Sequence, residues 1–229
     1  MKLEPLGDSA VVATLGSKID RSTLASVLRF SGALVAARGR GILDVVPAYA
    51  TVTVFYDPHQ FAEPGEDAYA TVCHFIEACA ALARGGRFAP APSTIEIPVC
   101  YGGEFGPDLE EVAERAKMAP GRFAALHAGA DYLVHAIGFT PGFPYLGGLP
   151  HALQTPRRDT PRVRVAAGSV GIGGAQTGVY PLASPGGWQI IGRTPLALFR
   201  PALQPPALLK AGDHVRFRSI SASELGTWT

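Results

Sequence analysis

Three features are scarce in this chain of 229 residues: cysteine, long apolar runs and, over one long stretch, acid and lysine. The three cysteines, Cys73, Cys79 and Cys100, have no Cys-x-x-Cys spacing, which argues against a disulfide framework and a structural zinc site. We therefore expect a cytoplasmic protein. No run of about 18 or more apolar residues occurs, so no membrane span is expected. The N-terminal stretch has an early acid and no long apolar core, so no signal peptide is expected either.

The charge is divided unevenly between the two halves of the chain. Residues 119–212 have seven arginines and Lys210 against only two acids, Asp131 and Asp159, which is a net charge of +6. Residues 1–118 have ten basic and fifteen acidic side chains, a net charge of −5. The second half is therefore suited to anionic ligands or to an acidic partner surface. Nucleic acid is the weaker interpretation, because no lysine-rich face is present.

The scarcity of acid and lysine excludes several kinds of site. Without paired carboxylates, the second half cannot build a two-acid hydrolytic site or a self-contained Mg²⁺ site, so a partner subunit must supply any such chemistry. The glycine-rich segment Gly168–Gly174 lacks the Gly-Lys-Ser/Thr ending of a phosphate-binding Walker loop. The dinucleotide-binding fingerprint fails too, because Gln176 stands where its last glycine belongs.

Residues 1–88 predict an α+β domain. Apolar periodicity indicates three strands and two helices, and Asp20 or Ser22 is expected to cap the first helix. The resulting order β-α-β-β-α suggests a ferredoxin-like arrangement. Residues 85–93, rich in glycine and proline, read as a linker. The strands are expected over residues 9–15, 42–48 and 51–56, and the helices over residues 19–37 and 67–83.

Residues 94–229 predict a second domain of a different kind. It begins with a strand over residues 95–101, and two helices follow over residues 108–118 and 122–130. From Tyr132 onward, short apolar runs are separated by glycine and proline turns. This spacing is typical of a closed β-barrel with long loops, and shaped loops on a rigid scaffold often carry binding residues.

Arginines form the sharpest group of candidate site residues. Arg157, Arg158, Arg162 and Arg164 lie within eight positions, and a guanidinium recognises a carboxylate or phosphate in a planar, bidentate manner. On a strand from Arg162 to Val165, the first and third side chains would share one face. The alternative is a solvated face of the barrel. Pro156 and Pro161 favour a held geometry, since proline restricts the backbone on each side.

The glycine-rich segment has two interpretations. Its backbone N–H groups could cradle an oxyanion or phosphate through Gly168, Ser169, Gly171 and Gly173, or the segment could be a turn of the barrel. Covalent catalysis by Ser169 is the weaker hypothesis, because the nucleophile elbow needs a glycine at position 167 and Ala167 stands there.

His135 and a group of uncharged polar residues complete the candidates. His135 lies in an apolar strand, where it either packs in the core or faces a site, and His127 and His151 give no metal-ligand spacing with it. The uncharged polar residues of segments 176–181 and 184–188 could orient a small ligand, or they could stabilise turns and pack in the core. We assign catalysis to His135, Arg162 and Gln176, and anion or substrate binding to Arg157, Arg164, the glycine-rich segment, Thr177, Tyr180, Ser184, Gly186 and Gly187, with no metal.

Seven motifs are distributed along the whole chain: GDSA (7–10), VVPAYATVTVFYDP (45–58), IPVCYGGEFGPDLEEVA (97–113), IGFTPGFPYLGGLP (137–150), TPRRDTPRVRVAAGSVGIGGAQTGVYP (155–181), SPGGWQIIGRTP (184–195) and AGDHVRF (211–217). Together they resemble the KipI/PxpB family, also described as allophanate hydrolase subunit 1. One difference is Ala166, where the family usually has proline before Ala-Gly-Ser.

The resemblance implies an N-terminal α+β domain and a C-terminal cyclophilin-like barrel. It also implies a subunit of a bacterial ATP-dependent 5-oxoprolinase, which opens the lactam 5-oxoproline to glutamate. The implied partners are a second, homologous barrel subunit (PxpC-type) and a sugar-hydrolase-like third subunit (PxpA-type), which would supply most contacts to ATP and Mg²⁺. Two other functions occur among similar proteins: a module of urea carboxylase or allophanate hydrolase, and inhibition of a histidine kinase without catalysis.

Overall fold

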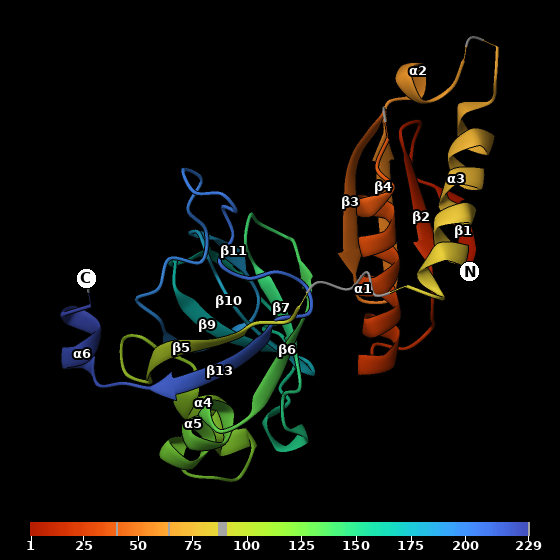
Figure 1. Cartoon of the computed structure of the whole chain (residues 1–229). Helices are drawn as coiled ribbons and strands as arrows, with labels where there is room; N and C mark the ends of the chain where they lie inside the picture. Colours follow the sequence, from red (N-terminus) through yellow and green to blue (C-terminus); the bar gives the residue numbers. More distant parts are fainter. Residues whose placement is uncertain (40, 64, 87–90, 229) are drawn as a thin grey trace. The chain divides into compact units, whose positions relative to one another are not determined.

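The chain forms two compact units, Met1–Ala91 and Pro92–Thr229. A computed structural model describes residues 1–39, 41–63, 65–86 and 91–228 (Figure 1). The sequence analysis placed the domain limits at residues 88 and 94, on either side of the expected linker. Residues 87–90 of that linker lie outside the described part of the chain. In the part that is described, no helix has both the length and the apolar character needed to cross a bilayer.

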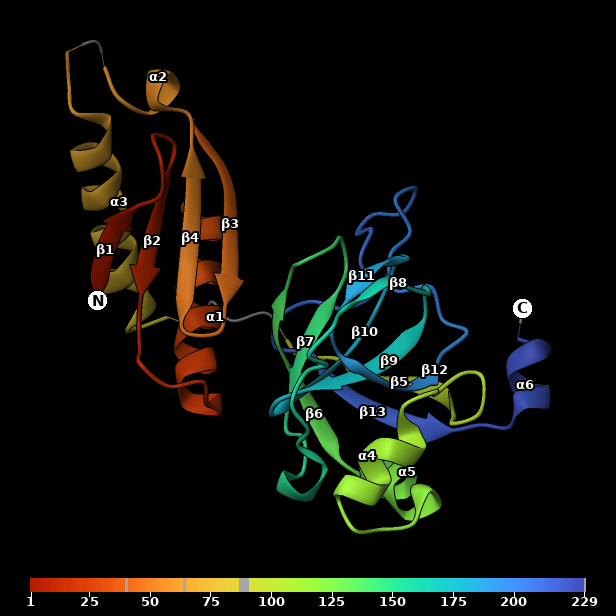
Figure 2. The same cartoon turned by 180° about the vertical axis from the view of Figure 1, so that it is seen from behind.

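The first unit is one antiparallel sheet covered on one face by helices. The strands are β1 (Lys2–Pro5), β2 (Ala10–Thr14), β3 (Ile42–Ala48) and β4 (Thr51–Tyr56), in the order β1-β2-β4-β3. Helices α1 (Arg21–Ala36) and α3 (Ala68–Ala83) lie on the same face of this sheet (Figures 1 and 2), and a short helix, α2 (Pro58–Phe61), precedes α3. Their facing side chains, among them Val27, Phe30 and Ile76, form the core of the unit.

Side-chain caps explain where the two long helices begin. The Oδ1 atom of Asp20 accepts a hydrogen bond from the backbone N–H of Thr23 at 2.8 Å, so Asp20, not Ser22, caps α1. Asp67 accepts from the N–H groups of Tyr69 and Ala70 at the start of α3. Each cap satisfies amide donors that a helix leaves without an internal acceptor.

The ferredoxin-like arrangement is not confirmed, although the α+β layers are. A ferredoxin-like order needs a last strand after the second helix. Here the edge position beside β2 is taken instead by β1, a strand that precedes all the elements expected from the sequence. β1 was not predicted from the sequence, because a strand of four mostly exposed residues has too few apolar positions to show the alternation typical of a strand.

The second unit is a closed barrel of mixed strands, as the glycine and proline spacing predicted. Within residues 91–228, seven strands follow the order β6-β13-β5-β12-β9-β10-β7, and pairing of β6 with β7 closes the ring. Only the β13–β5 pair among these is parallel. The barrel strands are β5 (Thr94–Tyr101), β6 (Asp131–Ile137), β7 (Pro144–Gly147), β9 (Ser169–Gly173), β10 (Gln176–Val179), β12 (Gln189–Arg193) and β13 (His214–Ser219).

Shorter elements decorate the barrel. Helices α4 (Leu109–Arg115) and α5 (Pro120–Ala128) lie side by side (Figures 1 and 2), and α5 begins with a proline at the position where its missing N–H costs nothing. A separate ribbon pairs β8 (Arg162–Val165) with β11 (Ser184–Gly186). The remaining elements are the 3-10 turn His151–Leu153 and the helix α6 (Ala222–Gly226).

A chain of polar groups crosses the apolar core of the barrel. The hydroxyl of Thr177 donates to the carbonyl of Gly171 at 2.9 Å, so its oxygen accepts from Nε2–H of His127, also at 2.9 Å. The other ring nitrogen, Nδ1, is then the acceptor for the hydroxyl of Tyr101 at 2.8 Å. His127 and Thr177 are both fully buried. Thr177 is therefore part of the core, and it does not orient a ligand as the sequence analysis expected.

Stability of the barrel should fall in mild acid because of His127. Burial lowers the pKa of His127 to about 3, whereas the unfolded chain has the usual value of 6.5. The unfolded state therefore binds a proton first, and stability that is complete above the unfolded pKa is lost as the pH falls. Denaturation in urea at pH 7 and pH 5 should show a loss of about 2 kcal/mol from this group.

The matched variants separate His127 from other titrating groups. His127→Gln should remove most of this pH dependence, and His151→Gln, which alters an exposed histidine, should leave it unchanged. If the free energy of unfolding changed with pH as strongly in His127→Gln as in the unchanged protein, the pH dependence could not be assigned to this ring.

Candidate functional site

One cavity of the second unit combines aromatic walls with a cationic wall. Its volume is about 370 Å³, which lies in the range of small-molecule pockets. Five of the candidate residues named from the sequence line it: Arg157, Arg158, Tyr180, Gly186 and Gly187. The full lining is Phe139, Phe143, Tyr145, Arg157, Arg158, Pro161, Tyr180, Pro185, Gly186, Gly187 and Trp188.

Phe143 is the centre of the aromatic wall. Its ring makes edge-to-face contacts with Tyr145, Tyr180 and Trp188 at centroid distances of 5.0, 5.1 and 5.5 Å. Such contacts hold the rings at defined angles. Burial raises the pKa of the Tyr180 phenol, so this hydroxyl remains protonated at neutral pH. At the mouth, Phe139 is exposed and has a φ of 67°, a strained conformation for a bulky residue of the kind that often occurs at functional sites.

Two glycines of the glycine-rich segment, Gly171 and Gly173, pack directly against Trp188. A Cβ atom on Gly173 would lie 2.7 Å from the indole Nε1, and one on Gly171 would lie 3.2 Å from the Cβ of Trp188. On the neighbouring strand, a Cβ on Gly178 would be 3.1 Å from the indole ring. Larger residues at these positions would displace the tryptophan. Gly171, Gly173 and Gly178 are therefore explained by close packing of one aromatic side chain.

The predicted oxyanion cradle is not formed, because the amides of this segment are already paired. β9 has ladder partners on both sides, β10 and β12. The N–H of Gly168 donates to the carbonyl of Tyr180 at 2.7 Å, and that of Gly174 donates to Thr155 at 2.8 Å. The segment is thus an interior strand with a tight turn before it. Ala166 replaces the usual proline in that turn, and its carbonyl still accepts from the N–H of Ser169 at 3.3 Å.

Asp108 holds two of the four clustered arginines. Its carboxylate, only 3% exposed, receives both Nη atoms of Arg162 at 2.9 and 2.7 Å and Nη1 of Arg158 at 3.1 Å. The backbone N–H of Ile190 donates to the same carboxylate at 2.6 Å. Arg162 therefore holds its loop against the start of α4, and its donors are not directed to a ligand as the sequence analysis expected.

Arg157 is the arginine left for a ligand. It is exposed and forms no ion pair with any carboxylate of the described residues. Its guanidinium lies 5.9 Å from the ring centroid of Trp188, a cation–π distance that orients it over the aromatic wall. Arg164 is exposed on β8 and does not line the cavity, so the four arginines do not converge on one pocket.

The other predicted site residues are distributed over the barrel and do not line this cavity. His135 is buried on β6, where its ring covers Gly147 so closely that a Cβ there would lie 2.5 Å from Nε2. Ser169 is buried at the start of β9, and Gln176 is half-buried on β10 opposite Gly173. Ser184 is half-buried on β11. No group of three or more His, Cys, Asp or Glu residues suited to a metal ion is found in the described ranges.

Three rings of the aromatic wall, Phe139, Phe143 and Tyr145, were not assigned from the sequence, although Tyr180 was. They lie in GFTPGFPYLGG, one of the glycine- and proline-rich loop segments after Tyr132 that were expected to carry binding residues. Asp108 lies 50 residues before Arg158, and the sequence analysis treated it as the start of a helix. Its burial could not be seen from its neighbours in the sequence.

Comparison with known proteins identifies the family. The model for "Carboxyltransferase domain, subdomain C and D" matches residues 1–209. The chain belongs to this carboxyltransferase-domain family. Two similar proteins are each named as a subunit of 5-oxoprolinase. The protein from Bacillus subtilis (strain 168) is 42% identical, covering 97% of this chain and 94% of the relative, and that from Escherichia coli O157:H7 is 44% identical, covering 93% of each.

Solved structures share the fold of this carboxyltransferase-domain chain. The crystal structure of TTHA0988 has a TM-score of 0.79 and 37% identity, and the match covers 93% of this chain and 40% of TTHA0988. The Kluyveromyces lactis urea carboxylase has a TM-score of 0.76 with 18% identity, covering 98% of this chain and 22% of that enzyme. At this low identity the second likeness shows the fold alone. The resemblance to the KipI/PxpB family noted in the sequence is confirmed.

Proposed function

We propose that this chain is a subunit of an ATP-dependent 5-oxoprolinase. The observation that supports this most strongly is the near full-length identity of 42% and 44% with two proteins named as 5-oxoprolinase subunits. The reaction converts 5-oxoproline to glutamate while ATP becomes ADP and phosphate. Two water molecules enter overall, since one opens the lactam and one takes up the phosphoryl group. A lactam needs such coupling because amide resonance makes its carbonyl unreactive.

The aromatic cavity is our candidate for the 5-oxoproline site. The substrate is a small ring with one carboxylate, and the cavity presents ring faces with one guanidinium that is free of carboxylate partners in the described ranges. In this arrangement, Arg157 binds the substrate carboxylate while Phe143, Tyr145 and Trp188 contact the ring. Arg–carboxylate pairing is directional and fixes the orientation of the bound molecule. The chain would thus position the lactam for chemistry completed elsewhere.

Partner subunits are the proposed place for most contacts to ATP and Mg²⁺, because the described residues of this chain offer few of the groups that usually bind them. The amides of the glycine-rich strand are paired, no lysine lies between positions 118 and 209, and no cluster of possible metal ligands exists in the described part. We therefore assign both to partner subunits. The partners we propose are the homologous barrel subunit (PxpC-type) and the third subunit (PxpA-type) implied by the resemblance. The cytoplasm is the expected compartment, because all three cysteines are free thiols.

Reconstitution tests this function. The chain should be co-expressed with the two partner subunits from the same source, and glutamate release from 5-oxoproline should be measured with and without ATP. We expect release that needs ATP and all three subunits. No release above that of the partners alone would contradict the proposal. Urea with bicarbonate replaces 5-oxoproline in a second arm, and ATP cleavage that depends on both of them would favour the carboxylase module.

A further inference from the structure

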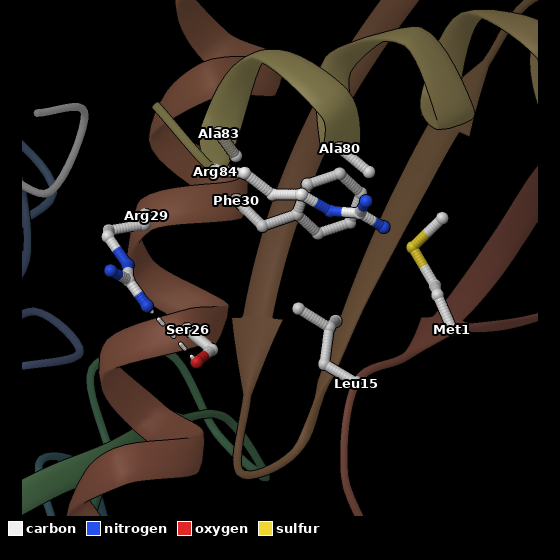
Figure 3. A pocket seen from close by; sticks show the side chains of 8 residues that line it. All are labelled: Met1, Leu15, Ser26, Arg29, Phe30, Ala80, Ala83 and Arg84. Atoms are coloured by element: carbon white, nitrogen blue, oxygen red, sulfur yellow. Dashed lines mark hydrogen bonds between the residues drawn. The ribbon is translucent and has the colours of Figure 1, made fainter. Parts of the chain in front are cut away.

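The first unit has a cavity of its own, separate from the proposed 5-oxoproline site. Its volume is about 330 Å³, and all of its lining residues belong to the first unit. They come from the N-terminus, the end of β2, and helices α1 and α3 (Figure 3). The lining is Met1, Leu15, Ser26, Arg29, Phe30, Ala80, Ala83 and Arg84.

The floor of this cavity is apolar. Phe30 and Ala83 are almost fully buried beneath it, and Leu15 and Ala80 are half-buried. The small side chains of Ala80 and Ala83 leave the space between α1 and α3 open at this point. A floor of this kind favours an apolar group over water, because burial of apolar surface is the main favourable contribution to binding.

Two guanidinium groups stand at the rim. In Figure 3, Arg84 extends from the end of α3 across the opening in front of Phe30 and toward Met1. Arg29 extends from α1, and its Nη2 makes only a long hydrogen bond to Ser26 Oγ, at 3.4 Å. Neither arginine forms an ion pair with a carboxylate in the parts of the chain that the structure describes. The Arg84 guanidinium lies beside the apolar floor and is available to an anion there, whereas the Arg29 guanidinium is turned toward Ser26 (Figure 3).

We infer that this cavity binds an apolar monocarboxylate, with the hydrocarbon part on the Phe30 floor and the carboxylate on Arg84. A guanidinium prefers a carboxylate because two parallel N–H donors match its two oxygens. The volume is near the lower limit for ligand pockets, so a short or medium chain fits better than a long one. The site does not depend on the 5-oxoprolinase role, because no residue is shared with the aromatic cavity.

An NMR titration of the full chain tests the site with three probes of one chain length: octanoate, 1-octanol and octylammonium. Octanoate should give saturable shifts centred on the amides of Ser26, Phe30 and Ala80. We expect octanol to bind about tenfold more weakly and octylammonium more weakly still, because only the carboxylate gains from pairing with Arg84. Equal affinities for octanoate and octylammonium, or no saturable shift, would overturn the site.

Variants locate the binding and keep the test independent of folding. Arg84→Gln should weaken the binding of octanoate about tenfold and leave the binding of octanol unchanged. Ala80→Leu should weaken the binding of both probes, because the larger side chain would fill the space above the apolar floor. Arg21→Gln changes another exposed arginine of α1, and Arg157→Gln changes the aromatic cavity, so both should bind octanoate normally. If either control lost as much affinity for octanoate as Arg84→Gln, the assignment of the site would be refuted. Thermal unfolding of each variant confirms that it is folded.

Discussion

Asp108→Asn should lower the free energy of unfolding by about 3–5 kcal/mol, the cost observed when one partner of a buried ion pair is removed. The carboxylate of Asp108 accepts hydrogen bonds from Arg158, Arg162 and the N–H of Ile190, and it is almost inaccessible to solvent. Asparagine keeps the shape and loses the charge. Two half-buried guanidinium groups would then lack an anionic partner.

The comparison that checks this result is with Glu111→Gln. Glu111 also pairs with an arginine, Arg115, at 2.5 Å, but both side chains are half-exposed on one helix. Exposed pairs of this type contribute about 0.3–0.5 kcal/mol. In urea denaturation, the loss in the free energy of unfolding should therefore be several times larger for Asp108→Asn than for Glu111→Gln. A loss below about 1 kcal/mol for Asp108→Asn would contradict the view that this carboxylate organises the loop.

The same geometry changes what is expected of Arg162. From the sequence, Arg162 was assigned a catalytic role, which would make its removal a loss of activity without a loss of stability. Because both of its Nη atoms bind Asp108, Arg162→Ala should instead destabilise the second unit. Any loss of turnover in that variant must be read together with its free energy of unfolding.

Arg157→Gln should raise the KM for 5-oxoproline in the reconstituted enzyme by about 30-fold, which corresponds to about 2 kcal/mol of lost binding. The guanidinium is proposed to hold the substrate carboxylate, which is not the reacting group. Its loss should therefore weaken the ground state and the transition state equally and change kcat little. The fold should be unaffected, since Arg157 is exposed and forms no ion pair with the described carboxylates.

Arg164→Gln is the matched control, because Arg164 is also exposed and belongs to the same loop region but does not line the cavity. Steady-state kinetics should show its KM close to that of the unchanged enzyme. A fall in kcat at constant KM for Arg157→Gln would move this arginine from substrate binding to the reacting carbonyl. Equal changes in both variants would indicate a general charge effect and not a defined site.

Much of the fold could be predicted because its signals are local. The α1 cap at Asp20, the apolar periodicity of α1 and α3, and the turn spacing after Tyr132 each lie within a few residues of what they determine. The strand β1 could not be predicted in this way, because its place at the edge of the sheet depends on pairing with β2 and not on the pattern of its own residues. Whether an exposed segment of four residues forms a strand is decided by its neighbour.

The candidate site was predicted less well for a related reason. A glycine in a dense run indicates that a side chain would not fit, but not what occupies the space. Here Trp188 occupies it, and the amides that a phosphate would need are paired across β9, β10 and β12. In the same way, four arginines in sequence look equivalent until their partners are known.

By itself, the sequence of this protein determined two units of different architecture, the main helices and the family to which the chain belongs. Only the tertiary structure decided which residues face a ligand. Asp108 neutralises Arg162 from 54 positions away, and His127 meets Thr177 across 50 positions. Contacts between such distant residues depend on how the strands and loops close in space, so short sequence motifs do not encode them. Arg157 could be singled out as the arginine open to a ligand only after those contacts had been found.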